Sequence, residues 1–197
     1  MNLTVFLRRN ISLSVLFSVL SMSLAWNVLL LWKAQANTTV ATPGARLDLA
    51  VDTVIPPLST LRLDGQPHQV RFGGPLPTIL YVLSPTCTWC DRNYDNIVAI
   101  GRAKKQDFSF VGLSTGHDLE VLKRYNQTNP LPFDVFLIES DDLVRSVGLA
   151  VTPQTALLDT GGRVQRVWSG AMFAQQKDDA ERFFGLALPG LRGIPRS

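Results

Sequence analysis

The two cysteines of this 197-residue chain, Cys87 and Cys90, lie where a strand-like run changes into a helical pattern. Residues 77–83 are mostly apolar and typical of a buried strand, residues 84–86 break that run, and residues 94–101 carry apolar side chains at helical spacing. The cysteines are therefore predicted to open a helix. Unpaired N–H groups at a helix start favour the thiolate form of the first cysteine, and thiolates attack disulfides. The pattern predicts a redox pair.

Two other uses of a close cysteine pair are weaker. A structural zinc site needs two further ligands, and only His68 and His117 are available, without a second cysteine pair. A structural disulfide that encloses two residues removes little chain entropy, so stability alone is a poor reason for one. We therefore expect a redox-active Cys87–Cys90 disulfide, with no metal and no other cofactor.

The N-terminal segment predicts export. Residues 11–32 contain no charged side chain, follow Arg8 and Arg9, and are closed by Lys33. This length spans a bilayer as one transmembrane helix, and the arginines favour an N-terminus inside. Residues 34–36 also resemble a signal-peptidase site, so a cleaved signal peptide is the alternative. Both readings place the remainder of the chain outside the cytoplasm.

The net charge of +3 does not indicate a nucleic-acid partner. Nucleic-acid binding surfaces carry lysine and arginine stripes, often with aromatic side chains between them. Here Lys104 and Lys105 form an isolated pair at a predicted helix end, and Arg192 and Arg196 lie near the C-terminus. We expect no nucleic-acid binding.

Downstream of the first segment the sequence predicts one domain. Residues 1–36 are the anchor or signal, residues 37–50 a linker, residues 51–188 the folded domain, and residues 189–197 a loose tail. Strand and helix patterns alternate along the domain. The expected elements are a hairpin of 58–63 and 69–72, a strand at 77–83, a helix at 87–104, a strand at 108–113, a helix from about 118 to 128, a strand at 133–138, a short helix ending at 148, an antiparallel pair at 155–158 and 164–168, and a closing helix at 173–188.

This order of elements, with the cysteine motif of residues 84–90, resembles the thioredoxin-like superfamily. Two further motifs carry the likeness, Val151-Thr152-Pro153 and the turn of residues 161–164. More narrowly, the chain resembles membrane-anchored thiol-disulfide oxidoreductases of the TlpA/ResA type, including those of cytochrome c maturation. The resemblance implies an α/β fold with a central mixed sheet flanked by helices. It also implies an N-terminal β-hairpin and an inserted helix and strand, with one transmembrane helix ahead of the domain.

The resemblance also implies the roles of site residues. Cys87 attacks a substrate disulfide and Cys90 resolves the mixed disulfide. Pro153 is cis and faces the cysteines, and the backbone of Thr152 pairs with the incoming peptide. Trp89 either contacts substrate or is a partly exposed aromatic residue.

The implied partners follow from the same likeness. They are a protein that carries the substrate disulfide, a membrane thiol reductase that supplies electrons, and the membrane itself through the N-terminal helix. The implied location is the bacterial inner membrane, single-pass, with the catalytic domain in the periplasm.

The chain departs from its relatives near the cysteines. Tyr81 stands where thioredoxins carry a buried acid, Asn93 stands where TlpA/ResA relatives often carry glutamate, and Thr86 stands where many carry tryptophan. No inherited base for Cys90 is evident, so the redox potential and the direction of catalysis stay open.

An alternative function is a thiol-based copper chaperone or assembly factor. Copper(I) suits paired thiolates. Relatives of that kind usually separate the cysteines by three residues and add a histidine, which this chain does not show.

Overall fold

The computed structural model describes residues 19–28, 48–116 and 118–193. The chain divides into one unit up to residue 44 and a second from residue 45. In the first unit, residues 19–28 are helical. Among the residues that the structure describes, no helix combines the length and apolar character needed to cross a membrane. The rest of the predicted span at 11–32, and most of the predicted linker, lie outside the described residues.

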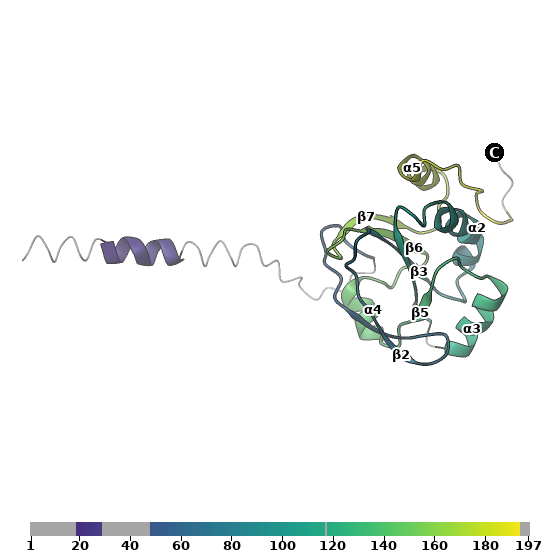
Figure 1. Ribbon diagram of the computed structural model, residues 1–197, viewed down its shortest axis with the longest axis horizontal. Helices are drawn as coiled ribbons and strands as arrows, with labels where there is room; N and C mark the ends of the chain where they lie inside the picture. The colour runs from purple at the N-terminus through teal and green to yellow at the C-terminus, as the bar shows by residue number, and fades with distance from the viewer. Residues whose placement is uncertain (1–18, 29–47, 117, 194–197) are drawn as a thin grey trace, which may run out of the picture. The chain divides into compact units, whose positions relative to one another are not determined.

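The second unit is built around a seven-stranded mixed sheet (Figure 1). The spatial order is β2-β1-β5-β4-β3-β6-β7, in which β3, β4 and β5 are parallel to one another and the remaining pairs are antiparallel. The predicted hairpin, β1 and β2, extends the sheet beside β5. The strands are β1 (Leu58–Leu61), β2 (Pro67–Val70), β3 (Thr78–Leu83), β4 (Ser109–Ser114), β5 (Val135–Leu137), β6 (Gln154–Leu158) and β7 (Val164–Ser169).

Four helices accompany the sheet, and local chemistry sets their ends. The Asp118 carboxylate accepts N–H groups at the start of α3, Ser140 does the same for α4, and α4 and α5 end at Gly148 and Gly185 in left-handed conformation. Because Gly185 stops α5, the closing helix predicted to reach residue 188 is shorter. The helices are α2 (Thr88–Ala103), α3 (Leu119–Thr128), α4 (Asp141–Val147) and α5 (Gln175–Phe184).

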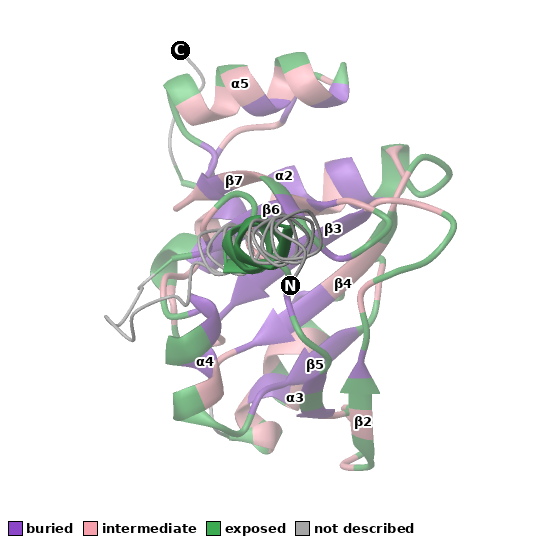
Figure 2. Ribbon diagram, turned by 90° about the vertical axis from the view of Figure 1, so that its left-hand side faces the viewer, coloured by how far each residue is buried: buried purple, intermediate pink, exposed green. Residues whose placement is uncertain are grey.

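The central strand β3 separates two apolar cores. All six of its residues are buried (Figure 2). Successive side chains of a strand point to opposite faces of the sheet. Ile79, Tyr81 and Leu83 pack with residues of α2, α3 and α5, whereas Leu80 and Val82 pack with residues of α4. Tyr81 therefore lies on the face that α2 covers, beneath the cysteine motif.

The folded domain is longer than predicted at both ends. Leu49 is buried, and its N–H donates to the Gln154 side chain at 2.7 Å. At the other end Leu191 is buried, and the N–H of Gly190 donates to Asn96 Oδ1 at 2.8 Å. The segment predicted as a loose tail is thus held against α2 as far as Arg192, because its backbone satisfies polar groups of that helix.

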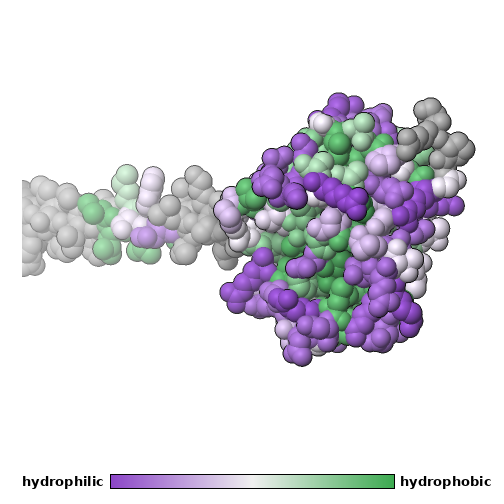
Figure 3. Space-filling model, turned by 45° about the vertical axis from the view of Figure 1, so that its right-hand side comes forward, coloured by the Kyte–Doolittle hydropathy of each residue, from purple (hydrophilic) through white to green (hydrophobic). Residues whose placement is uncertain are grey.

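Apolar side chains also reach the surface of this unit. In the view of Figure 3 they form a continuous area in the middle of the face, bordered by polar side chains. Trp89 and Phe173 are among the large apolar residues of the domain that are exposed.

Candidate active site

Cys87 caps the N-terminus of α2, directly after the loop that leaves β3. Its backbone is extended (φ −83°, ψ 111°), and its Sγ accepts the N–H of Cys90 at 3.2 Å. The side chain is half-buried, so solvent and a substrate can reach it. An N–H donor aimed at the sulfur, at the positive end of the helix, stabilises negative charge there.

Cys90 lies one helical turn further along, with no exposed surface. Burial raises the pKa of its thiol well above the ordinary value, and the hydrogen bond with the Cys87 side chain raises it further. Both cysteines are free thiols. The geometry thus makes Cys87 the reachable sulfur and Cys90 the protected one.

The loop before β6 brings Thr152 and Pro153 to the same place. The Thr152–Pro153 peptide bond is cis, and the Thr152 carbonyl accepts the Cys87 thiol at 3.4 Å across 65 residues of sequence. The Pro153 carbonyl accepts the N–H of Gly170 at 2.8 Å, which ties this loop to the end of β7. The carbonyl of the Thr152–Pro153 peptide bond therefore lies beside the Cys87 sulfur.

Trp89 is on the surface of the same helical turn. Its side chain is 49% exposed, and the guanidinium of Arg92 lies 5.1 Å from its ring centroid. A cation held over the indole face restrains the ring where it is. The role of Trp89 in contacting substrate stays a prediction.

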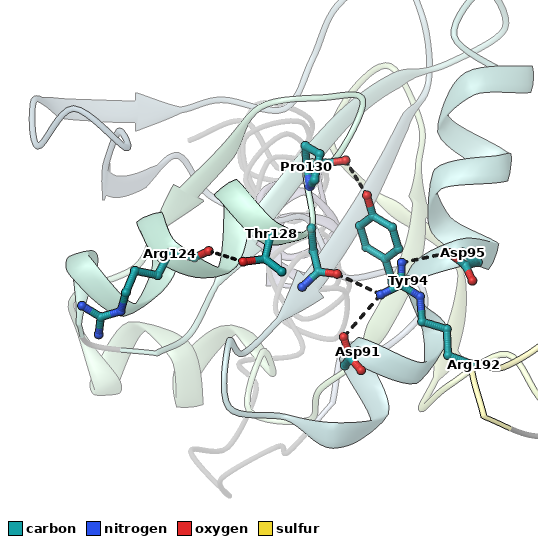
Figure 4. A network of polar contacts seen from close by, with 8 residues as sticks. Asp91, Tyr94, Asp95, Arg124, Thr128, Pro130 and Arg192 are labelled. Atoms are coloured by element: carbon teal, nitrogen blue, oxygen red, sulfur yellow. Dashed lines mark hydrogen bonds and ion pairs between the residues drawn. The ribbon is translucent and has the colours of Figure 1, made fainter.

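A residue near the C-terminus joins this site, and the sequence analysis missed it. The Arg192 guanidinium lies 3.0 Å from Asp95 Oδ1, 3.5 Å from Asp91 Oδ1 and 4.1 Å from the Tyr94 ring centroid (Figure 4). It also donates to Asn129 Oδ1 at 2.9 Å. No local pattern signals a contact between residues about 100 positions apart, so only the fold could reveal that Asp91, beside Cys90, is paired.

The core around Cys90 contains two tyrosine side chains and one asparagine side chain. Tyr81 on β3 is 2% exposed, and burial, followed by the nearby Cys90, raises the pKa of its phenol. The pKa of Tyr125 on α3 is also raised, by burial first and then by Cys90. Asn93 is fully buried. Tyr81 and Asn93 are two of the departures from the family pattern, whereas Tyr125 was predicted only as part of a helix face.

Among the described residues, no group of three or more histidine, cysteine or acidic side chains is arranged to hold a metal ion. A cavity of about 470 Å³ lies elsewhere, between the β1–β2 turn and the segment before β5. Arg62, Asp64 and Phe133 are among its lining residues, and neither cysteine is. The cavity is thus separate from the site described above.

Solved structures share this fold. The thioredoxin domain of a thiol-disulfide oxidoreductase from Bacteroides vulgatus is 20% identical, with TM-score 0.57, covering 70% of this chain and 99% of its own. StoA from Bacillus subtilis is 18% identical, with TM-score 0.52, covering 64% and 96%. A secreted Mycobacterium tuberculosis disulfide oxidoreductase homologous to E. coli DsbE is 17% identical, with TM-score 0.53, covering 65% and 94%.

These similarities establish a mixed α/β thioredoxin-like fold, in agreement with the fold that the sequence motifs implied. Several of the similar structures are thiol-disulfide oxidoreductases or thioredoxin-domain proteins. No protein-family model matches the chain. No curated protein matches its sequence.

Proposed function

We propose that this protein is an exported, membrane-anchored thiol-disulfide oxidoreductase that reduces disulfides in partner proteins. One observation carries the proposal: a half-buried Cys87 at a helix start, beside the Thr152 carbonyl, with a fully buried Cys90 behind it. A reachable sulfur and a protected second sulfur on the same helical turn are the two parts that disulfide exchange requires.

The reaction has two exchanges. The Cys87 thiolate attacks one substrate sulfur, a bond forms between them, and the other substrate sulfur leaves with the electron pair and takes up a proton. Cys90 then attacks Cys87 Sγ, which forms the Cys87–Cys90 disulfide and releases the second substrate sulfur as a thiol. The substrate gains two electrons and two protons, and the protein loses them.

The loop at Thr152 suits a peptide substrate. An extended peptide can add to exposed backbone as an extra strand, and the Thr152 carbonyl is already within reach of Cys87. Trp89 offers an exposed aromatic face next to the attacking sulfur. We propose that both contact the partner protein.

Turnover requires that Cys87–Cys90 be reduced again. We propose a thiol reductase of the membrane as the electron donor, with residues 11–32 as the anchor of a single-pass protein of the bacterial inner membrane. The catalytic domain would then lie in the periplasm, where an oxidising environment makes such a donor necessary. Alkaline extraction of membranes tests the anchor: the full chain should stay in the pellet, and a cleaved, soluble product would refute it.

Serine variants test the chemistry in the full chain. With dithiothreitol as electron source, the natural protein should reduce insulin faster than the uncatalysed reaction, and Cys87→Ser should fall to that background. In a separate incubation with a disulfide substrate and without dithiothreitol, pre-reduced Cys90→Ser should accumulate a mixed disulfide through Cys87, which non-reducing electrophoresis detects. Each variant controls for the other, because each keeps one sulfur. Wild-type turnover by Cys87→Ser would refute the proposed function.

The direction of the reaction follows from the reduction potential. Equilibration with glutathione should give a value well below about −200 mV for a reductant, whereas a value near about −120 mV would mark an oxidant.

A further inference from the structure

Two buried polar atoms on residues near Cys90 in the fold have no hydrogen-bond partner among the residues that the structure describes. They are the Tyr81 hydroxyl and the Asn93 side-chain nitrogen, on residues that are 2% and 0% exposed. Buried donors without a partner are rare in folded proteins because each loses its bonds to water and gains none in return. Their presence next to a buried thiol calls for a chemical reason.

The orientation of the Asn93 amide is determined by its oxygen. Asn93 Oδ1 accepts the N–H of Met172 at 3.0 Å and the side-chain N–H of Asn96 at 3.1 Å. The oxygen is thus occupied by two donors, so the NH₂ end must point the other way. That end faces the Tyr81 oxygen, although the pair does not reach hydrogen-bond geometry.

Tyr81 and Cys90 are buried in the same apolar core. Tyr81 points from β3 toward α2, and both residues belong to the same buried apolar cluster. Asn93 follows Cys90 by three positions, so the two share one face of α2. The Asn93 nitrogen is a donor and cannot take the hydroxyl proton of Tyr81, so that proton is available to a nearby acceptor. After burial, Cys90 is the group that most raises the pKa of the Tyr81 phenol, which indicates that the two side chains are close.

The resolving step requires a Cys90 thiolate, and a hydrogen-bond donor near the sulfur would stabilise it. Cys90 attacks only as a thiolate. Burial disfavours that anion more than the hydrogen bonds with the Ser84 backbone and the Thr152 side chain favour it. A neutral hydroxyl next to the sulfur can donate to the anion, and such charge-assisted bonds are roughly twice as strong as neutral ones. The other titratable groups that interact with Cys90 are Cys87 on α2 and Tyr125 on α3. Asp91 raises the pKa of Tyr125, and Arg192 lowers it.

We propose that the Tyr81 hydroxyl, oriented by the Asn93 amide, donates a hydrogen bond to the Cys90 sulfur while it is anionic in the resolving step. Tyr81 and Asn93 are thus positioning residues for Cys90, and the inference rests on the proposed function. In the mixed disulfide Cys90 loses its proton, the thiolate is held by Tyr81, and the Cys90–Cys87 bond forms as the Cys87–substrate bond breaks. The electron pair goes to the substrate sulfur, which takes up through solvent the proton that Cys90 lost.

The test replaces only the hydroxyl, with Tyr81→Phe in the full chain. The reduced protein is mixed with a fluorescent disulfide peptide, quenched with acid at intervals, and separated into free, mixed-disulfide and oxidised forms. We expect the resolving rate at neutral pH to fall about tenfold or more, so that the mixed disulfide accumulates. The rate should recover only at higher pH, by about one unit or more. Alkylation of Cys87 by iodoacetamide should be unchanged.

Thr155→Val is the matched control. Thr155 lies opposite Tyr81 on β6, and its hydroxyl is also buried and without a partner, but its short side chain keeps that hydroxyl at the level of the sheet. Both variants remove an unpaired buried hydroxyl, so both should unfold at the same or a higher urea concentration than the natural protein. Thr155→Val should resolve at the natural rate.

Three results separate the possible outcomes. A Tyr81→Phe protein that resolves within about twofold of the natural rate overturns the inference. Equal slowing by Thr155→Val also overturns it, because the effect would then come from packing. In either of these two outcomes, an inactive Cys87→Ser protein means that the proposed function stands although the inference about Tyr81 is wrong. Wild-type turnover by Cys87→Ser would remove the proposed function itself.

Discussion

Replacing Arg192 by alanine should destabilise the domain, because this side chain connects the C-terminal segment to α2 and α3. Three of its contacts carry weight. The cation over the Tyr94 ring contributes about 0.5–1 kcal/mol, and a hydrogen bond from a charged donor to Asn129 contributes about 1.5 kcal/mol. The ion pair with Asp95 is partly exposed on both sides and contributes about 0.5 kcal/mol. The longer contact with Asp91 adds little.

These contributions overlap, so we expect Arg192→Ala to lower the free energy of unfolding by about 2 kcal/mol. For a domain of this size the dependence on urea is about 2 kcal/mol per molar, which gives a midpoint lower by about 1 M. The assay is urea unfolding of the full chain, kept reduced and followed by tryptophan fluorescence. Arg192→Lys should lie between the two proteins, because it keeps the charge but lacks the planar fork.

The matched control is Arg182→Ala on α5. Its side chain is 70% exposed and forms a 3.6 Å ion pair with Asp179. Such surface pairs contribute about 0.5 kcal/mol or less, so its midpoint should fall by no more than about 0.25 M. If Arg192→Ala shifts the midpoint no further than Arg182→Ala does, the C-terminal segment is not fastened to α2 in solution and the reasoning is wrong.

Two further predictions concern the rest of the fold. Gly148→Ala should cost about 3 kcal/mol in urea unfolding, since φ is +84° and the new Cβ would meet the Asp48 carbonyl, whereas Gly185→Ala, also left-handed but with open space around it, should cost about 1 kcal/mol. Equal losses would contradict that close approach. Asp159 accepts the N–H groups of Arg163 and Gly161, which hold the pKa of its carboxyl below the ordinary value. A lowered folded-state pKa stabilises the protein above the unfolded value and loses that effect as pH falls below about 4. In Asp159→Asn the urea midpoint should therefore fall less on acidification than in the natural protein. Asp178→Asn, at an exposed position, is the control and should keep the natural pH dependence. Identical pH profiles for all three proteins would contradict the assignment.

Much of the fold could be predicted because its signals are local. The apolar run before Cys87 and the helical spacing after it are short-range patterns, and each became an element within one or two residues of the predicted bounds. The end of α5 was misplaced because the left-handed Gly185 stops the helix, while the apolar residues that follow pack without being helical.

Spacing and residue type alone determined that Cys87 and Cys90 form a pair at a helix start, because both depend on neighbours a few positions away. Tertiary structure decided what surrounds the pair. The Thr152 carbonyl accepts the Cys87 thiol across 65 residues of sequence, and the Arg192 guanidinium pairs with Asp91, the neighbour of Cys90, across 101 residues. Only the packing of strands and helices sets these contacts. Motifs report local geometry, whereas the electrostatic surroundings of a buried thiol depend on every element that packs against it.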